Sequence, residues 1–273
     1  MPHPTLLLIG DFEQPEFCAA AAAMHAACRV VRASSIASAE NQLEGDEQPP
    51  DMVVLAQSRP GEHAFGDVQR LRHRMPLSPI IVLLGAWSEG ETRTGEPLPD
   101  VVRVYWHQWL PKFEQQIEMF AHDTCPSWGL PPTSTDEERL LWSNKNSRPK
   151  YDGVVAIAAE RHELAGWLAD GCAAMGLRAV RTIPGASINP SDFLFVLWDT
   201  LLGAGDVTDL AALREAFAEI PIVVVTSFPR TDDRQRLLAA GAAAVLSKPM
   251  SLEDFEYQLK MLRAPRRRQL TLP

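Results

Sequence analysis

FLFVLWD, residues 193–199, is an apolar run that ends in an aspartate, and two similar runs follow it along the chain: IVVVTS (222–227) and AAVLSKP (243–249). Short apolar runs of this kind are typical of strands that are buried on both faces of a parallel sheet. Function in such sheets collects at the carboxyl ends of the strands. We therefore expect Asp199, Thr226 and Lys248, which close the three runs, to meet at one edge of an α/β domain.

The second half also contains the runs VVAIAAE (154–160) and AVRTI (179–183), which complete a set of five predicted strands. Helical spacing of apolar residues predicts a helix after the first of them, through Leu164, Leu168, Cys172 and Met175. Only residues 184–192 separate the second predicted strand from the third, which is too short for a helical crossover. We expect a doubly wound, five-stranded parallel sheet in which that helix is lost or reduced to a turn.

The first half repeats this order, which predicts two tandem α/β domains of the same class. Its strand-like runs are TLLLIGD (5–11), CRVVRAS (28–34), DMVVLAQ (51–57), IIVLLGA (80–86) and VVRVYW (101–106). The segment 90–99 carries two Gly and two Pro, so we expect an irregular loop there. We predict domains at 1–122 and 151–264, a linker at 123–150 that packs onto one or both of them, and a basic tail at 265–273.

The second half resembles the receiver domain of response regulators. The resemblance implies that Asp199 stands at the phosphoacceptor position, that Thr226 is the hydroxyl residue that follows it, and that Lys248 with Pro249 is the Lys-Pro junction. It also implies the strand order 2-1-3-4-5 for each half. In this family the lysine offsets the charge of the phosphorylated aspartate.

The first strand of the second half departs from the receiver pattern. Ala158 and Ala159 occupy the positions of the two metal-binding acids, and Glu160 follows them. Magnesium prefers a shell of oxygen ligands with one or two carboxylates, so we expect no cofactor beyond weak magnesium binding at Asp199 and Glu160. Phosphotransfer should then be slow or absent. The alternative for Asp199 and Lys248 is a salt bridge that only orders the loops.

The first half resembles a receiver in its order of elements alone. Ala56, Gly85 and Leu110 stand where the acceptor, the hydroxyl residue and the lysine would be, and Asp11 is the acid that remains. Aromatic residues gather instead near the ends of its fourth and fifth strands: Trp87, Tyr105, Trp106 and Trp109. We interpret them as a contact surface. The alternative is that they pack within their own core.

Composition restricts the classes of partner. The chain has 273 residues with a formal net charge of −9, so we do not expect nucleic acid as a partner. No apolar stretch approaches the length of a membrane helix and no secretory signal is present, so we expect a cytoplasmic protein without a membrane partner. No nucleophile, phosphate-loop or dinucleotide motif is present, which argues against an enzyme.

Our leading hypothesis is a signal-transduction protein of two tandem pseudo-receiver domains that acts through protein-protein contacts, with a kinase, another signalling protein or a second copy as the partner. The first alternative is a genuine response regulator of a two-component phosphorelay, phosphorylated on Asp199 by a histidine kinase. The second is a flavodoxin-like protein that binds or converts a small molecule, since fold does not fix function.

Overall fold

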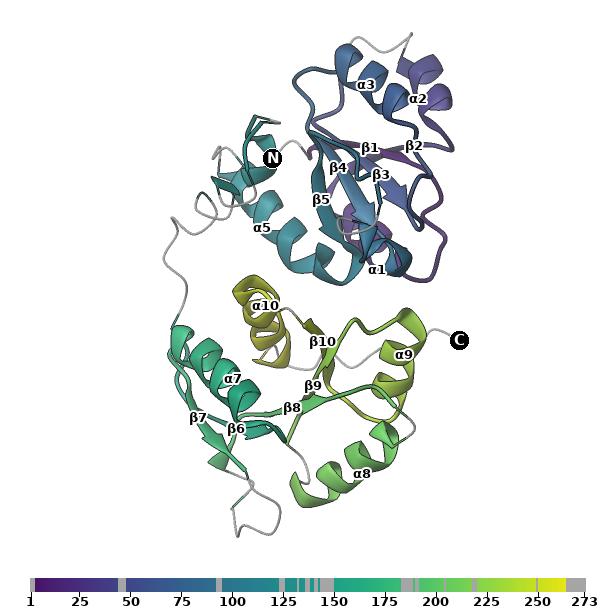
Figure 1. Ribbon diagram of the computed structural model, residues 1–273. Coiled ribbons are helices and arrows are strands. Elements are labelled where there is room, and N and C mark those ends of the chain that lie inside the picture. Colours follow the sequence, from purple (N-terminus) through teal and green to yellow (C-terminus); the bar gives the residue numbers. More distant parts are fainter. Residues whose placement is uncertain are drawn as a thin grey trace, which may run out of the picture. The chain divides into compact units, whose positions relative to one another are not determined.

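A computed structural model divides the chain into two compact units, Met1–Ser147 and Arg148–Pro273. Each unit is an α/β domain (Figure 1). The structure describes residues 3–43, 48–91, 95–122, 126–131, 133–135, 138–139, 142, 150–182, 189, 192–203, 205–217, 220–248 and 250–263.

The first unit is built on a five-stranded sheet in which all strands are parallel, in the order β2-β1-β3-β4-β5. Its strands are β1 (Thr5–Ile9), β2 (Arg29–Ala33), β3 (Met52–Gln57), β4 (Ile80–Leu84) and β5 (Val102–Tyr105). Its helices are α1 (Cys18–Ala27), α2 (Ile36–Leu43), α3 (Phe65–Arg74) and α5 (Trp109–Ala121), with short 3₁₀ turns η1 (Ala86–Ser88), η2 (Trp106–Gln108) and η3 (Ser127–Gly129).

Alternation along the strands sends side chains into two cores, one on each face of this sheet. Leu6 and Leu8 of β1 join one apolar cluster with residues of α1 and α5. Leu7 and Ile9 join the other cluster with residues of α2 and α3. This double burial is why the strand runs are almost continuously apolar.

The second unit has a parallel sheet in the order β10-β9-β8-β6-β7, which is 2-1-3-4-5 when its own strands are counted along the chain. Its strands are β6 (Val154–Ala158), β7 (Arg178–Arg181), β8 (Val196–Thr200), β9 (Ile222–Ser227) and β10 (Ala244–Lys248). Its helices are α7 (His162–Ala174), α8 (Asp206–Phe217), α9 (Thr231–Ala239) and α10 (Leu252–Arg263). The predicted fold class and strand order are therefore confirmed in both units.

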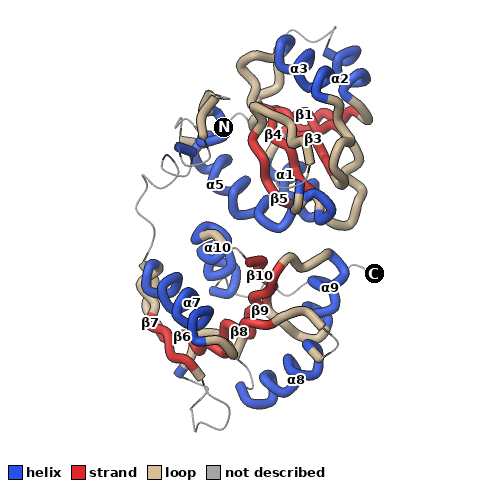
Figure 2. Tube along the Cα trace, viewed as in Figure 1, coloured by secondary structure: helices blue, strands red, loops and turns tan. Residues whose placement is uncertain are grey.

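Helices cover both faces of this second sheet as well (Figure 2). Val155 and Ile157 of β6 pack in one cluster with residues of α7 and α10, while Ala156 packs in the other with residues of α8 and α9. The predicted loss of the helix after β7 concerns residues 184–192, of which only 189 and 192 are among the described residues.

The beginning of the predicted linker packs on the first unit. Trp128 of η3 is 4% exposed and its ring lies 5.3 Å from that of Trp109. The side chain of Gln116 fixes this turn, because its Oε1 accepts hydrogen bonds from Ser127 Oγ at 3.1 Å and from the Trp128 amide at 3.0 Å. The predicted boundaries at 122, 150 and 264 stay predictions, and the basic tail lies outside the described residues.

Candidate functional site

An ion pair spans the carboxyl edge of the second sheet. Lys248, the last residue of β10, donates through Nζ to Oδ1 of Asp199 near the end of β8, across the intervening strand β9. The side chain of Asp199 is 8% exposed and that of Lys248 is 13% exposed. Burying two charged groups costs desolvation free energy unless they neutralise each other. The contact between Lys248 and Asp199 offsets this cost for both groups.

Thr226 lies on β9, the strand that the ion pair crosses. The residue is fully buried, and its Oγ1 has no hydrogen-bond partner among the described residues. A buried hydroxyl without a partner is destabilising and is uncommon in native structures. The structure therefore joins two of the three strand-end residues that the sequence singled out, Asp199 and Lys248, and places Thr226 on the strand between them. Pro249 lies outside the described residues.

Alanines occupy the positions of the two missing acids, and an arginine binds the backbone beside them. Ala159 is 8% exposed and belongs to an apolar cluster. The guanidinium of Arg181 on β7 donates to the backbone oxygens of Ala159 at 3.1 Å and of Glu160 at 2.8 Å, so a positive group holds the turn after β6. Glu160 itself is exposed.

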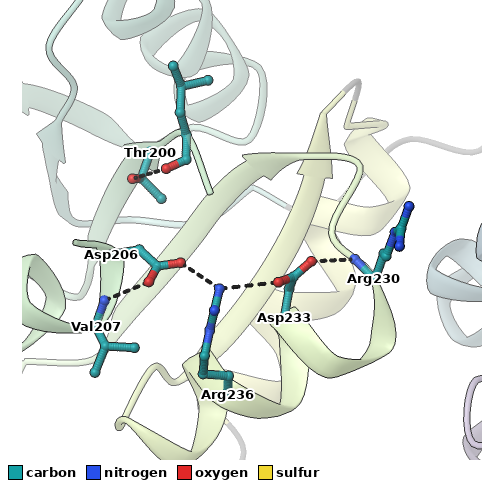
Figure 3. Close-up of polar contacts among 7 residues, drawn as sticks. Thr200, Asp206, Val207, Arg230, Asp233 and Arg236 are labelled. Carbon is teal, nitrogen blue, oxygen red and sulfur yellow. Dashed lines mark hydrogen bonds and ion pairs between the residues drawn. The ribbon is translucent and has the colours of Figure 1, made fainter. Parts of the chain in front are cut away.

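Asp206, the first residue of α8, is held by two polar contacts (Figure 3). Its Oδ2 binds Arg236 of α9 at 2.9 Å, and its Oδ1 accepts the amide of Val207 at 2.8 Å, with the side chain only 2% exposed. Arg236 also binds Asp233 at 3.1 Å. Asp206 therefore ties the start of α8 to α9, a role that apolar spacing in the sequence does not signal.

No group of three or more His, Cys, Asp or Glu side chains within the described part of the chain is arranged to hold a metal ion. The chemistry of the donor set agrees with this observation, because one carboxylate already neutralised by a lysine is a poor site for magnesium. Weak magnesium binding at Asp199 and Glu160 stays a prediction.

Two exposed apolar residues border the ion pair. Leu201 follows β8 and is 79% exposed, while Phe228 follows β9 and is 56% exposed. Phe228 has a φ of 48°, a left-handed conformation that is strained for a bulky side chain. Strain of this kind persists at functional positions more often than elsewhere. Sequence reasoning missed both residues, because neither belongs to a periodic pattern.

In the first unit, a glutamate fills the edge where a receiver has its acceptor. Ala56 is buried, and Glu16, from the loop before α1, accepts Ser58 Oγ at 2.8 Å and the Ala86 amide at 3.0 Å. A Cβ at Gly85 would lie 2.0 Å from Glu16 Oε1 and 2.9 Å from Ser58 Cα, so a larger residue there would displace Glu16. Sequence reasoning missed Glu16, because it lies in a loop.

Asp11, the remaining acid of this unit, organises its own turn. It accepts the amide of Glu13 at 2.9 Å and the side-chain amide of Gln14 at 2.7 Å. These hydrogen bonds, the backbone one foremost, hold the pKa of Asp11 below its usual value. They favour the charged carboxylate without any metal.

The four aromatic residues of the first unit do not form one exposed surface. Trp109 is fully buried and Trp106 is 8% exposed, and both belong to the apolar core over α1 and α5. Tyr105 is half-buried, and Trp87 on η1 is 60% exposed. The alternative of packing within the domain core therefore holds for Trp106 and Trp109, the first residues of η2 and α5, because both belong to this buried cluster.

Comparison with known proteins finds similar structures but no similar characterised sequence. No protein-family model matches the chain, and no curated protein matches it. A putative pilus assembly-related protein from Burkholderia pseudomallei matches 40% of this chain and 88% of its own, with 17% identity and a TM-score of 0.35. A response regulator receiver protein from Pseudoalteromonas atlantica matches 40% of this chain and 95% of its own, with 13% identity and a TM-score of 0.35.

A third solved structure matches along nearly the whole chain. It is the C-terminus of E. coli RcsC, which contains a linker region and a phosphoreceiver domain, and the match covers 95% of this chain and 92% of that one with 15% identity and a TM-score of 0.31. Receiver domains thus recur among the similar structures. The strand order of both units defines a doubly wound parallel α/β fold of the 2-1-3-4-5 class.

None of the described helices combines the length and apolar character needed to cross a membrane.

Proposed function

We propose that this protein is a signalling protein of two tandem receiver-like units, in which the second unit has given up magnesium-dependent phosphotransfer and works through protein contacts. The observation that carries the proposal is the buried ion pair of Lys248 with Asp199 beside methyl groups at positions 158 and 159. The acceptor carboxylate is neutralised by the lysine, and no acid stands on the first strand to recruit a metal.

The chemistry of phosphoryl transfer explains why this combination matters. Transfer to a carboxylate depends on positioning and on cations that neutralise charge on the phosphoryl oxygens, and magnesium normally supplies most of that charge. Lys248 alone supplies one positive charge, and this charge is already paired with the carboxylate of Asp199. An incoming phosphoryl donor would have to break this pair without a metal in place.

Protein contact is the use that the surroundings of the pair favour. Leu201 and Phe228 place exposed apolar surface on the two loops that border Asp199 and Lys248. Exposed aromatic residues beside a polar edge are typical of recognition sites rather than of solvated loops. A partner that rests on these loops would sense whether the pair is closed.

One observation favours the first alternative, a genuine phosphoacceptor. Thr226 lies on the strand between the two partners of the ion pair, and its hydroxyl, which has no hydrogen-bond partner among the described residues, could donate to an incoming phosphoryl oxygen. A phosphorylated Asp199 would also keep Lys248 paired, with the phosphoryl group as the new anion.

Treatment with acetyl phosphate and magnesium, followed by intact-mass measurement, separates the two functions. We expect no stable phosphoryl adduct on the parent protein, and an adduct on the Ala158→Asp/Ala159→Asp variant that disappears when Asp199→Asn is added. Stoichiometric modification of the parent that Asp199→Asn abolishes would establish the genuine response regulator instead.

A further inference from the structure

Two acidic residues lie at the two ends of the turn η1: Glu16 contacts its first residue, Ala86, and Glu89 follows its last. Glu16 is fixed there by Ser58 Oγ and by the backbone amide of Ala86. Glu89 follows η1 directly, and the charge of Glu16 acts on its carboxyl group. The two acids come from different loops, so the fold rather than local sequence brings them together.

Few hydrogen bonds or positive charges stabilise the buried carboxylate of Glu89. Its side chain is 13% exposed, and its Oε1 makes no hydrogen bond among the residues described. A cationic candidate is His107 of η2, whose Nε2 lies 3.6 Å from Glu89 Oε1. That distance is longer than a hydrogen bond, so it leaves the carboxyl oxygen without a firm donor.

The groups that face Glu89 divide into those that favour its neutral form and those that favour its charged form. Burial, and after it the negative charge of Glu16, raise the pKa of Glu89 to about 7, while the indole of Trp106 opposes them. His107 favours the charged form when it is protonated. Arg103 donates to Glu91, at 2.7 Å, so its charge is directed to the neighbouring acid.

We propose that Glu16 and Glu89 form a proton-responsive site in the first unit, in which Glu89 takes up one proton from solvent opposite the fixed charge of Glu16. In the protonated state the carboxyl of Glu89 is neutral and can donate to a neighbouring oxygen. In the deprotonated state two carboxylates repel each other at the base of η1, which carries the exposed Trp87. The switch changes the charge of this edge by one, without a covalent step.

This inference goes beyond the proposed function and does not depend on Asp199, because it concerns residues of the first unit alone. The carboxyl edge of the first sheet, where Ala56 stands at the acceptor position, would then change its net charge with pH. The signal would be pH, and the element that moves would be η1.

Carbon-13 NMR of the full chain, labelled at the glutamate side-chain carboxyl carbon, tests the proposal directly. Glu89→Gln identifies the resonance, and Glu16→Gln removes the neighbouring charge while keeping the hydrogen-bonding shape. We expect one carboxyl to titrate with a midpoint near 7, to vanish in Glu89→Gln, and to titrate at lower pH in Glu16→Gln. Glu118→Gln, an exposed position on α5, is the control that should leave the midpoint unchanged.

The emission of Trp87 provides the second readout. Parent fluorescence minus that of Trp87→Phe should change with the same midpoint as Glu89, and this change should be lost in Glu89→Gln. Titration of every glutamate below pH 6, or a midpoint near 7 that Glu16→Gln does not move, would overturn the proposal. A Trp87 signal that is independent of pH would overturn the movement of η1.

Discussion

Lys248 closes onto Asp199 across strand β9, and the pair is buried while the acids that would bring magnesium to it are absent. In this arrangement the positive charge of the lysine is directed to the carboxylate of Asp199. The two buried charges therefore offset each other at the carboxyl edge of the second sheet.

Asp199→Asn should destabilise the second unit by about 1–3 kcal/mol, because it leaves Lys248 buried without its counter-charge. Hydrogen exchange of peptides from β8 and β10 measures this loss in the full chain. The double variant Asp199→Asn/Lys248→Met removes both charges and should recover much of the stability. Equal or slower exchange in Asp199→Asn would mean that the aspartate is held there for chemistry and not for stability.

Arg236→Met should loosen the packing of α9 against α8, because the buried carboxylate of Asp206 loses its cation. We expect a cost of about 1–3 kcal/mol, the range for an uncompensated buried acid. Asp232→Asn is the matched control, since Asp232 is an exposed residue on the same helix. Faster exchange in α9 peptides for the control as well would count against the tie between Asp206 and Arg236.

Trp109→Ala should destabilise the first unit by about 3–5 kcal/mol, because the ring is fully buried against Phe113 and Trp128. Trp87→Ala should leave the thermal midpoint nearly unchanged, since that ring is mostly exposed. Differential scanning calorimetry of the two variants compares the effects. Similar midpoints for both would contradict the division of these rings into core and surface.

The stability of the first unit should fall as pH rises from about 4.5 to about 7. The pKa of Glu89 is raised in the folded state, so the fold binds this proton more tightly than the unfolded chain does, and the advantage is lost as the group ionises. Thermal midpoints of the parent and of Glu89→Gln at pH 5 and pH 8 isolate this contribution. The parent should lose stability relative to Glu89→Gln at the higher pH, and a constant difference would contradict the sign.

Much of the fold could be predicted because its signal is local. The strand runs are apolar on both faces and short, and the sheet order followed from the resemblance that Asp199, Thr226 and Lys248 carry. The meeting of Asp199 with Lys248 was likewise foreseeable, since parallel strands bring their carboxyl ends to one edge.

The remaining features depend on contacts that no local pattern encodes. Glu16 and Glu89 lie in loops, and only the folded chain brings Glu16 to the turn η1 that Glu89 follows. Trp106 and Trp109 follow a strand end, a position that suggested a surface, but both belong to the buried core cluster. Asp206 is an acid at a helix start, and its buried tie to Arg236 needs α9 to be in place.

Titration of the protein with magnesium, by calorimetry and by the emission of Trp198 beside Asp199, tests the central claim most directly. We predict no saturable binding in the range where a receiver would bind the ion. Binding should appear in Ala158→Asp/Ala159→Asp, and Asp199→Asn in that background should weaken it again. Tight, saturable binding of magnesium to the parent chain that Asp199→Asn removes would contradict the account, because it would show a working metal site without the two acids.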